Sequence, residues 1–203
     1  MEMQGSRQLA ITQQQAWDAL NDPAVLKTCI PGCDKVEPTS ENQYSIGMAL
    51  KIGPVAAKFS GKIALSDINP PQSYTISFEG QGGPAGFGKG SAKVQLAPND
   101  RGTELRYNVQ ASVGGKIAQL GQRLIDGAAK SMAEDFFKRF DGAMQLRHPE
   151  AYAAQAQADA AAGVAAAPAA ALSAGPMGLP LWVWIAAGAA VAGLLAVVVA
   201  LAR

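Results

Sequence analysis

Five successive runs between residues 44 and 113 alternate apolar with polar side chains, and no other feature restricts the fold as strongly. The runs are residues 44–52, 55–65, 74–78, 92–96 and 105–113. A period of two is typical of strands that bury one face and expose the other. Turn sequences such as Gly53-Pro54 separate the runs. The pattern predicts an antiparallel meander of five or six strands, whose apolar face another element has to cover.

A long amphipathic run over residues 114–146 predicts that cover. Its apolar positions recur at the helical spacings of three and four: Ile117, Leu120, Gly121, Leu124, Ala128, Met132, Phe136, Phe140 and Met144. About 30 residues at 1.5 Å each give a helix about 45 Å long. Small side chains dominate its first half, and Phe136, Phe137 and Phe140 dominate its second half. We therefore expect a closed core beneath the phenylalanines and empty space beneath residues 121–128.

Two short helices are predicted between a first strand and the meander. Residues 1–11 alternate loosely, as a strand does, and Thr12 can cap the helix that follows. Asp22-Pro23 separates this helix from a second one, which ends at the turn Ile30-Pro31-Gly32. The whole pattern predicts an α+β domain over residues 1–146, in which an antiparallel sheet is covered by one long C-terminal helix.

The C-terminal part of the chain has a different composition. Residues 181–202 contain neither a charge nor a proline, and at 1.5 Å per residue they would extend about 33 Å, enough for a bilayer core of about 30 Å. Trp182 and Trp184 lie near the start of this segment, where interfacial aromatic residues are expected. We predict one transmembrane helix, joined to the domain by a flexible linker rich in Ala and Pro over residues 147–180.

Residue types that build catalytic or metal sites are sparse. The net charge of +1 gives no indication of nucleic-acid binding. His148 is the only histidine and falls in the predicted linker, so neither a Ser-His-Asp nor a Cys-His set can form. Cys29 and Cys33 with one distant histidine cannot supply four metal ligands, and their spacing favours a structural turn over a reactive thiol. No pair of carboxylates falls on a predicted inward face, so we expect neither a catalytic set nor a metal.

A glycine-rich segment at residues 80–91 holds a near match to a phosphate-binding loop. Residues 83–89 fit GxxxxGK, but Gly90 follows in place of Ser or Thr, and a strand follows in place of a helix. Phosphate binding needs the helix N-terminus. We interpret the segment as a long mobile hairpin loop with Phe87 at its tip, able to act as a gate over a cavity.

Two polar side chains fall on the predicted inward face of the sheet. Arg7 shares its face with Leu9 and Ile11, and a buried unpaired guanidinium would be very costly. A position at the rim, with the charged end in water, is favoured over a role in anchoring a ligand. Tyr107 on the last strand is either a core tyrosine with a satisfied hydroxyl or a contact for a ligand.

Four segments carry a resemblance to a known family: CIPGC (29–33), KIGPVAAKFSGKIALSDINPP (51–71), GGPAGFGKGSAKVQL (82–96) and GGKIAQLGQRLIDGAAKSMAEDFF (114–137). They resemble the CoxG family, named for the G subunit of carbon monoxide dehydrogenase. The resemblance implies the START-like (SRPBCC) helix-grip fold, in which an antiparallel sheet wraps around a long C-terminal helix and encloses an apolar cavity. It also implies an association with molybdenum-containing CO dehydrogenases and related hydroxylases, and a role in attaching them to the cytoplasmic membrane. It supplies no catalytic residues.

These observations together predict a non-enzymatic carrier and adaptor on a membrane tether. No signal-peptide pattern precedes the domain, so we expect the domain in the cytoplasm and residues 181–202 as a single-pass tail anchor in the inner membrane of a bacterium. The cavity is expected to hold an apolar small molecule, a respiratory quinone or a lipid, with no covalent cofactor. Quinone is favoured because the implied partner yields electrons and the anchor reaches the bilayer in which quinone dissolves.

The predicted cavity residues are the large inward side chains of the strands together with the helix positions nearest to them. They are Trp17, Met48, Leu50, Phe59, Phe78, Phe87, Tyr107, Leu120, Leu124 and Ala128. Two alternatives remain open from the sequence. One is a membrane adaptor or assembly factor with a filled core and no ligand, and the other is an enzyme acting on a hydrophobic substrate.

Overall fold

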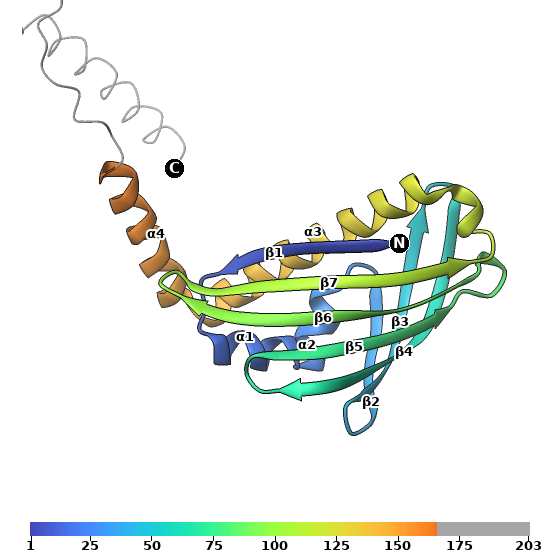
Figure 1. Cartoon of the computed structure of the whole chain (residues 1–203), viewed down its shortest axis with the longest axis horizontal. Helices are drawn as coiled ribbons and strands as arrows, with labels where there is room; N and C mark the ends of the chain where they lie inside the picture. Colours follow the sequence, from blue (N-terminus) through green and yellow to red (C-terminus); the bar gives the residue numbers. More distant parts are fainter. Residues whose placement is uncertain (166–203) are drawn as a thin grey trace, which may run out of the picture. The chain divides into compact units, whose positions relative to one another are not determined.

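A seven-stranded antiparallel sheet wraps around one long helix in the computed structural model, which describes residues 1–165 (Figure 1). The strand order is β1-β7-β6-β5-β4-β3-β2, so the first strand closes against the last one. Every neighbouring pair is antiparallel. The strands are β1 (Glu2–Leu9), β2 (Cys33–Ser40), β3 (Gln43–Ile52), β4 (Val55–Asn69), β5 (Ser73–Gln81), β6 (Phe87–Asn99) and β7 (Gly102–Gly114). The predicted α+β meander is confirmed.

The two short helices follow β1 as predicted. Helix α1 (Gln13–Leu20) begins with a capping box, in which the Thr12 hydroxyl accepts from the Gln15 amide and the Gln15 side chain accepts from the Thr12 amide. Such a cap contributes about 1 kcal/mol. Helix α2 (Pro23–Cys29) has Asp22 as its N-cap. The capping hydrogen bonds and Arg147 lower the pKa of Asp22, although burial alone would raise it.

The long helix starts later than predicted. Strand β7 runs to Gly114, a short 3₁₀ turn η2 (Ala118–Leu120) follows, and helix α3 (Gln122–Arg147) begins only after Gly121. Gly115 and Gly121 have φ values of 83° and 87°, which a continuous right-handed helix excludes. Helix α3 therefore has 26 residues and is about 39 Å long.

The buried face of α3 is also displaced by one position in its first turn. Its buried side chains are Ile125, Phe137, Phe140 and Met144, whereas Leu124 is 43% exposed. Leu124 instead lies beside Gly53 in the turn between β3 and β4. Positions 124 and 125 are about 100° apart on a helix, so the apolar run satisfies the helical period with either one inward, and packing against the sheet selects Ile125.

The closed core lies where the C-terminal half of α3 meets α1, α2 and the β1–β7–β6 edge. Phe140 and Met144 are fully buried there together with Leu9 and Ile11. The Thr103 hydroxyl, also fully buried, donates to the Ile11 carbonyl at 2.9 Å. The filled core predicted beneath the phenylalanine end is present around Phe140, but Phe136 and Phe137 border empty volume, so this prediction is confirmed only in part.

The connection between β5 and β6 is not the long mobile loop that the glycine content predicted. The two strands pair as far as Gln81 and Phe87, and the five residues between them include the 3₁₀ turn η1 (Gly83–Ala85). The amide of Ile117 donates to the Ala85 carbonyl at 3.0 Å, which ties this turn to η2. Glycine here permits tight backbone contacts: Gly86 has φ of 122°, and a Cβ on it would collide with the Gly114 carbonyl.

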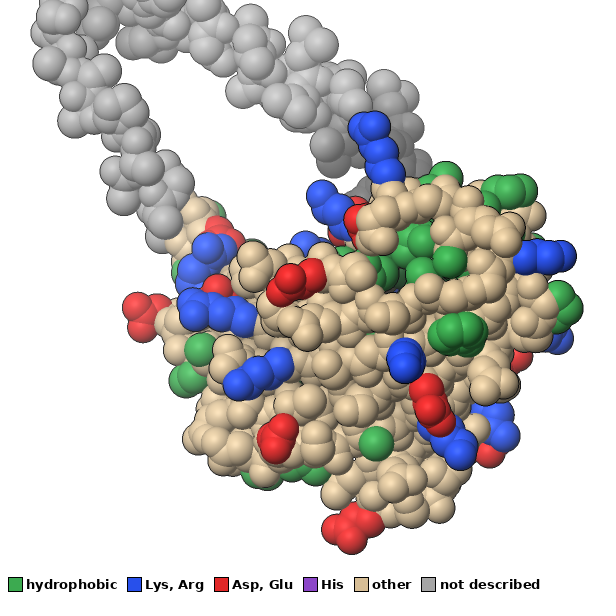
Figure 2. All heavy atoms as spheres, turned by 45° about the vertical axis from the view of Figure 1, so that its right-hand side comes forward, with side chains coloured by type: hydrophobic (Ala, Val, Ile, Leu, Met, Phe, Trp, Pro, Cys, Tyr) green, Lys and Arg blue, Asp and Glu red, His purple; other side chains and the backbone are tan. Residues whose placement is uncertain are grey.

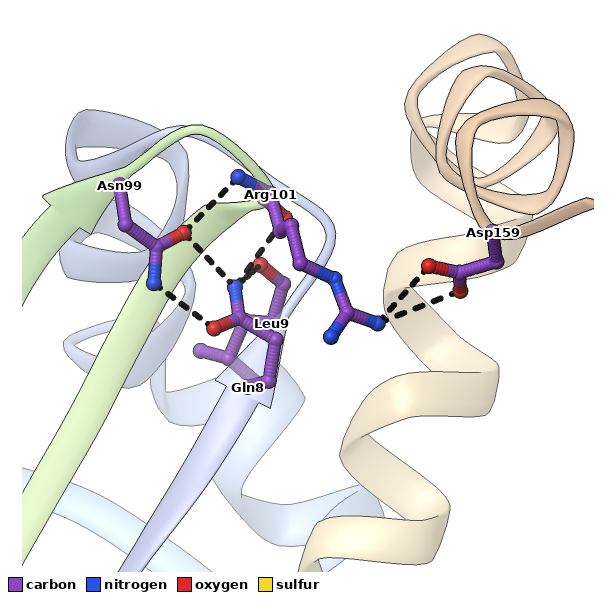
Figure 3. Close-up of polar contacts among 5 residues, drawn as sticks. All are labelled: Gln8, Leu9, Asn99, Arg101 and Asp159. Atoms are coloured by element: carbon purple, nitrogen blue, oxygen red, sulfur yellow. Dashed lines mark hydrogen bonds and ion pairs between the residues drawn. The ribbon is translucent and has the colours of Figure 1, made fainter. Parts of the chain in front are cut away.

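Helix α4 (Pro149–Ala165) occupies the first part of the range that the sequence assigned to a linker. Ala151 and Tyr152 pack against the core, and the Tyr152 hydroxyl donates to Asp141 at 3.4 Å. Further along, Arg101 contacts Asp159 at 2.9 Å (Figure 3). Figure 3 also shows that Asn99 and Gln8 exchange hydrogen bonds beside this contact. Alanine favours helix, and these contacts hold the first turns of α4 against the domain.

The remaining predictions about the C-terminal part fall outside the described residues. They are the rest of the linker, residues 166–180, and the transmembrane segment at residues 181–202. Within residues 1–165, no helix is both long enough and apolar enough to cross a membrane.

Candidate functional site: an apolar cavity beneath helix α3

Two adjoining apolar compartments lie between α3 and the concave face of the sheet. The larger one measures about 360 Å³ and lies toward the turn between β3 and β4; we call it the hairpin compartment. The smaller one, about 270 Å³, lies beneath Phe136 and Phe137; we call it the phenylalanine compartment. Both linings contain the same four isoleucines, Ile30, Ile46, Ile63 and Ile76. Together they have the size of a small-molecule site.

The hairpin compartment is lined by large apolar side chains from both sheet and helix. Strands β3 and β4 contribute Met48, Leu50, Ile52 and Phe59, strand β5 contributes Phe78, and the helical side contributes Ile117 and Ile125. Ile125 is therefore the side chain that the start of α3 points into the cavity. The space expected beneath the small-residue end of the long run is present.

Three glycines form the floor of this compartment. Gly61 on β4 pairs with Gly80 on β5, and Gly80 pairs with Gly88 on β6, so they make one row across three strands. A Cβ added to Gly80 or Gly88 would approach other atoms no closer than 3.7 Å and 3.8 Å, which is ordinary contact, whereas one on Gly61 would come within 2.5 Å of the Glu79 carbonyl. The missing side chains at Gly80 and Gly88 therefore leave open volume above bare backbone.

Aromatic rings form much of the phenylalanine compartment. The ring of Tyr107 stacks on Phe137 with centroids 5.6 Å apart, and Phe136 packs edge-on against Phe137 at 5.2 Å. Tyr74 is buried beside them, and burial raises the pKa of its hydroxyl far above the ordinary value. The lining of the compartment thus contains aromatic rings and no charged side chain.

A charged cluster covers the outer side of Phe137. The Arg7 guanidinium lies 5.8 Å from the Phe137 ring centroid and 3.7 Å from the Asp141 carboxylate. Burial raises the pKa of Asp141, while Arg7 and the Tyr152 hydroxyl act in the opposite direction. The Arg7 side chain is 41% exposed, so it lies at the rim, as the sequence favoured.

Six of the ten predicted cavity residues border the cavity: Met48, Leu50, Phe59, Phe78, Phe87 and Tyr107. Of the others, Trp17 packs edge-on against Tyr74, with ring centroids 5.3 Å apart, and lies against the hydrophobic core, partly buried. Leu124 is largely exposed, and neither Leu120 nor Ala128 is part of either lining. Leu120, Leu124 and Ala128 lie outside the cavity lining because the predicted helix began too early and its predicted inward face was displaced.

Phe87 borders the hairpin compartment, but its side chain belongs to the opposite face of the sheet. It alternates in phase with the exposed Lys89, while Ala92 and Val94 point inward and are buried. A Cβ on Gly114, its cross-strand partner on β7, would come within 2.5 Å of the Phe87 ring, so the ring covers that glycine. The gate that the sequence suggested depended on a long loop that the structure does not contain.

Sequence reasoning missed the glycine row and the inward positions Ile117, Ile125, Phe136 and Phe137 as cavity residues. The alternation had already placed Ile46, Ile63 and Ile76 inward, so these could have been added from the same signal. The glycine row had no local signal, because its members are far apart in sequence and only strand register aligns them.

Within residues 1–165, no group of three or more His, Cys, Asp or Glu side chains is arranged to hold a metal ion. Cys29 is buried in the core and Cys33 is partly exposed; both are free thiols, and burial raises the pKa of each. Neither has the lowered pKa of a reactive thiolate. The described residues thus enclose an apolar cavity, and its lining shows no evident acid–base or nucleophilic pair.

Comparison with known proteins assigns the family. The family model for CoxG, the G subunit of carbon monoxide dehydrogenase, matches residues 5–144 of the 203. The chain belongs to the CoxG family. The match covers the whole sheet from within β1 and most of α3, so the CoxG region and the cavity-bearing domain coincide.

Solved structures agree on the fold. A conserved protein from Geobacillus kaustophilus is 37% identical, with 72% of this chain and 96% of that chain covered and a TM-score of 0.69. A protein from Mycobacterium smegmatis (16% identity, 72% and 92% covered, TM-score 0.55) and the ZhuI aromatase/cyclase of Streptomyces sp. R1128 (12% identity, 72% and 94% covered, TM-score 0.53) share the architecture. At such identities they support the fold alone, which is of the helix-grip (SRPBCC) type. No curated protein matches the chain.

Proposed function

We propose that this CoxG-family chain is a membrane-tethered, non-enzymatic accessory protein of a molybdenum CO dehydrogenase-type hydroxylase, and that it carries an apolar ligand in the cavity beneath α3. The observation that carries the proposal is the pair of adjoining apolar compartments, about 360 and 270 Å³, inside the CoxG domain. A fold that served only as an adaptor would gain stability by filling this volume, since each buried methylene contributes about 0.8 kcal/mol.

A respiratory quinone fits the chemistry of this cavity. The hairpin compartment is lined almost wholly by hydrocarbon and bare backbone, which suits an apolar chain, and the phenylalanine compartment presents the stacked ring of Tyr107. Aromatic faces stack favourably on a flat ring. The family takes its name from CO dehydrogenase, and oxidation of CO releases electrons that a quinone can accept. A bound quinone could thus accept the electrons that the partner enzyme releases.

The predicted anchor at residues 181–202 supports a location of the protein at a membrane. It would hold the protein in the cytoplasmic membrane of a bacterium as a single-pass tail anchor, with the domain on the cytoplasmic side and beside the bilayer in which quinone dissolves. The lack of an evident catalytic pair in the described lining supports a carrier over an enzyme. Transfer of a ligand requires only binding, release and contact with a partner.

The test is native mass spectrometry of the full chain, purified with its own membrane lipids, followed by organic extraction of whatever the protein holds. We expect a quinone mass on the intact protein, and competition by added quinone for a fluorescent apolar probe. A cavity that holds neither quinone nor lipid from the membrane, and takes up neither on titration, would leave only the adaptor role.

The membrane role has a separate test. Deletion of residues 181–203 is expected to move the hydroxylase from the membrane fraction to the soluble fraction of the cell while the domain keeps its ligand. If the hydroxylase stays on the membrane after this deletion, the chain does not tether it.

A further inference from the structure

The end of the domain at which the hairpin compartment lies carries an uneven charge. This end consists of residues 51–58 around the β3–β4 turn, 80–90 around the β5–β6 turn, and 112–131 from the end of β7 into α3; we call it the basic end. Six cations fall within these segments, against a single carboxylate, Asp126: Lys51, Lys58, Lys89, Lys116, Arg123 and Lys130. The whole chain, in contrast, is almost balanced, with 17 cationic and 16 acidic residues.

The cations of the basic end are exposed and have no partner among the residues that the structure describes. None of the six takes part in an ion pair there, whereas Arg7, Arg101, Arg106 and Arg147 elsewhere in the domain each contact a carboxylate. The one carboxylate of the basic end, Asp126, accepts a hydrogen bond from the Gln122 side chain at 2.6 Å. This end therefore keeps a net positive field toward solvent.

Apolar side chains are exposed among these cations. Of the four most exposed large hydrophobic residues in the described part of the chain, two lie here: Phe87 at 49% and Leu124 at 43%. Leu124 sits beside Gly53 at the tip of the β3–β4 turn. Figure 2 looks toward this side of the domain and shows hydrophobic side chains set into a hollow, with Lys and Arg side chains around it. Exposed apolar side chains ringed by cations are the combination that binds an anionic membrane surface.

The geometry points to a second membrane contact: we propose that the basic end docks on the anionic surface of a lipid bilayer. Phe87 and Leu124 then enter the headgroup region, and Lys51, Lys58 and Lys116 face the lipid phosphates. Because Ile117 and Ile125 line the hairpin compartment just behind this surface, docking brings the larger compartment against the bilayer. This last consequence rests on the proposed carrier function, whereas the docking itself does not.

The basic end and the start of helix α4 lie at opposite ends of helix α3. The basic end lies at the start of α3, and α4 follows its end about 39 Å farther along. Fifteen residues, 166–180, separate the last described residue from the predicted membrane segment; fully extended, they would reach about 50 Å. Docking of the basic end is therefore a contact made by the described domain itself, separate from the predicted anchor.

The experiment uses the full chain in vesicles of phosphatidylcholine alone and of phosphatidylcholine mixed with phosphatidylglycerol. The predicted anchor is the same in both, so a difference between the two belongs to the domain. Amide hydrogen exchange is followed for peptides covering residues 51–58 and 115–131. We expect exchange in these peptides to be at least about tenfold slower in the anionic vesicles, and the difference to vanish when salt is raised from about 0.15 M to about 1 M.

A matched pair of variants isolates the charge. One replaces four cations of the basic end with glutamine: Lys51, Lys58, Lys116 and Arg123. The control replaces four exposed cations elsewhere: Lys27, Lys93, Lys138 and Arg139. Each cation removed from the basic end is expected to weaken docking roughly fivefold, while the control keeps the protection. Unchanged exchange in β6 and β7 verifies that both variants fold.

Either of two results with vesicles alone overturns the inference: equal exchange in the two kinds of vesicle, or equal loss of protection in the two variants. Protection of the same peptides by the purified hydroxylase, without protection by anionic vesicles, also overturns it and assigns the surface to a protein partner. Quinone content is measured in parallel. Quinone on a protein that does not dock refutes only this inference, whereas docking by a protein that never holds an apolar ligand refutes only the proposed carrier function.

Discussion

Replacing Gly88 by valine tests directly whether the space above the glycine row is real and used. A Cβ at this position meets nothing closer than the Val113 side chain at 3.8 Å, and the backbone there does not have the positive φ that favours glycine. The valine side chain adds three carbon atoms to the hairpin compartment. At about 0.8 kcal/mol for each buried carbon, less about 0.5 kcal/mol of side-chain entropy, the ligand-free protein should become about 2 kcal/mol more stable.

Bound ligand reduces the stability advantage of the variant over the wild-type protein. A gain of about 2 kcal/mol corresponds to a rise in Tm of roughly 4–8 °C for a domain of this size. Quinone at a hundred times its Kd stabilises the wild-type protein by about 2.7 kcal/mol. The variant, whose valine occupies part of the site, should gain much less, because its Kd is expected to rise at least about tenfold. Thermal unfolding of the detergent-solubilised full chain, with and without added quinone, measures both quantities.

Two further substitutions serve as controls. Gly61→Val would bring a Cβ within 2.5 Å of the Glu79 carbonyl, so it should destabilise the fold by about 1–3 kcal/mol through overpacking. Ser112→Val adds a similar side chain on the exposed outer face of β7 and should change stability by no more than about 0.5 kcal/mol. If Gly88→Val lowers Tm as Gly61→Val does, or raises it without weakening quinone binding, the assignment of the compartment as the ligand site is refuted.

The remaining predictions concern the core, the thiols and the rim. Phe140→Ala should lower the free energy of unfolding by about 3–5 kcal/mol because Phe140 is fully buried, and Phe87→Ala by under about 1 kcal/mol because its ring is half exposed. Urea unfolding compares the two variants, and similar losses would contradict the outward orientation of Phe87. One thiol per folded chain, that of Cys33, should react with a thiol reagent, and Cys29 only after unfolding, because it is buried; two reactive thiols in the native protein would disprove the placement of Cys29. Because burial raises the pKa of Asp141 above 3.8, this carboxyl favours the folded state most at low pH and should lose that contribution as pH rises through its folded pKa. Asp141→Asn should remove this pH dependence from Tm profiles recorded between about pH 4 and pH 7. An unchanged profile would show that the burial of Asp141 does not affect the stability of the fold.

Local patterns predicted the sheet well because the pleat of a strand is a local property. Alternation placed Met48, Phe59 and Phe78 inward, and all three line the cavity. The helix cap at Thr12 and the turn after Cys29 could likewise be predicted, because each depends on residues close together in sequence. Alternation along β6 also predicts the orientation of Phe87, because positions 92 and 94 point inward and odd positions therefore point outward. The glycines around Phe87 obscured this pattern.

The helix was predicted less well for a physical reason. An apolar run at spacings of three and four is satisfied by more than one inward line of side chains, and packing against a particular surface selects one. Contact with the sheet selected Ile125 over Leu124, and the left-handed backbone of Gly121 delayed the helix start to Gln122. The inward residue and the start of the helix both depend on where β7 ends and how the chain turns after it. The helical period of the apolar residues does not specify either.

The amino-acid sequence by itself determined the alternating strand pattern, the polarity of each face and the resemblance to CoxG. Only the tertiary structure decided the extent of the empty volume and the residues that line it. That volume exists because strand register aligns Gly61, Gly80 and Gly88 in one row on the cavity side of the sheet. The tertiary structure likewise gathers six cations from three separate segments of the chain at the same end of the domain. Register and the proximity of distant turns are long-range properties, so no local pattern in the chain records them.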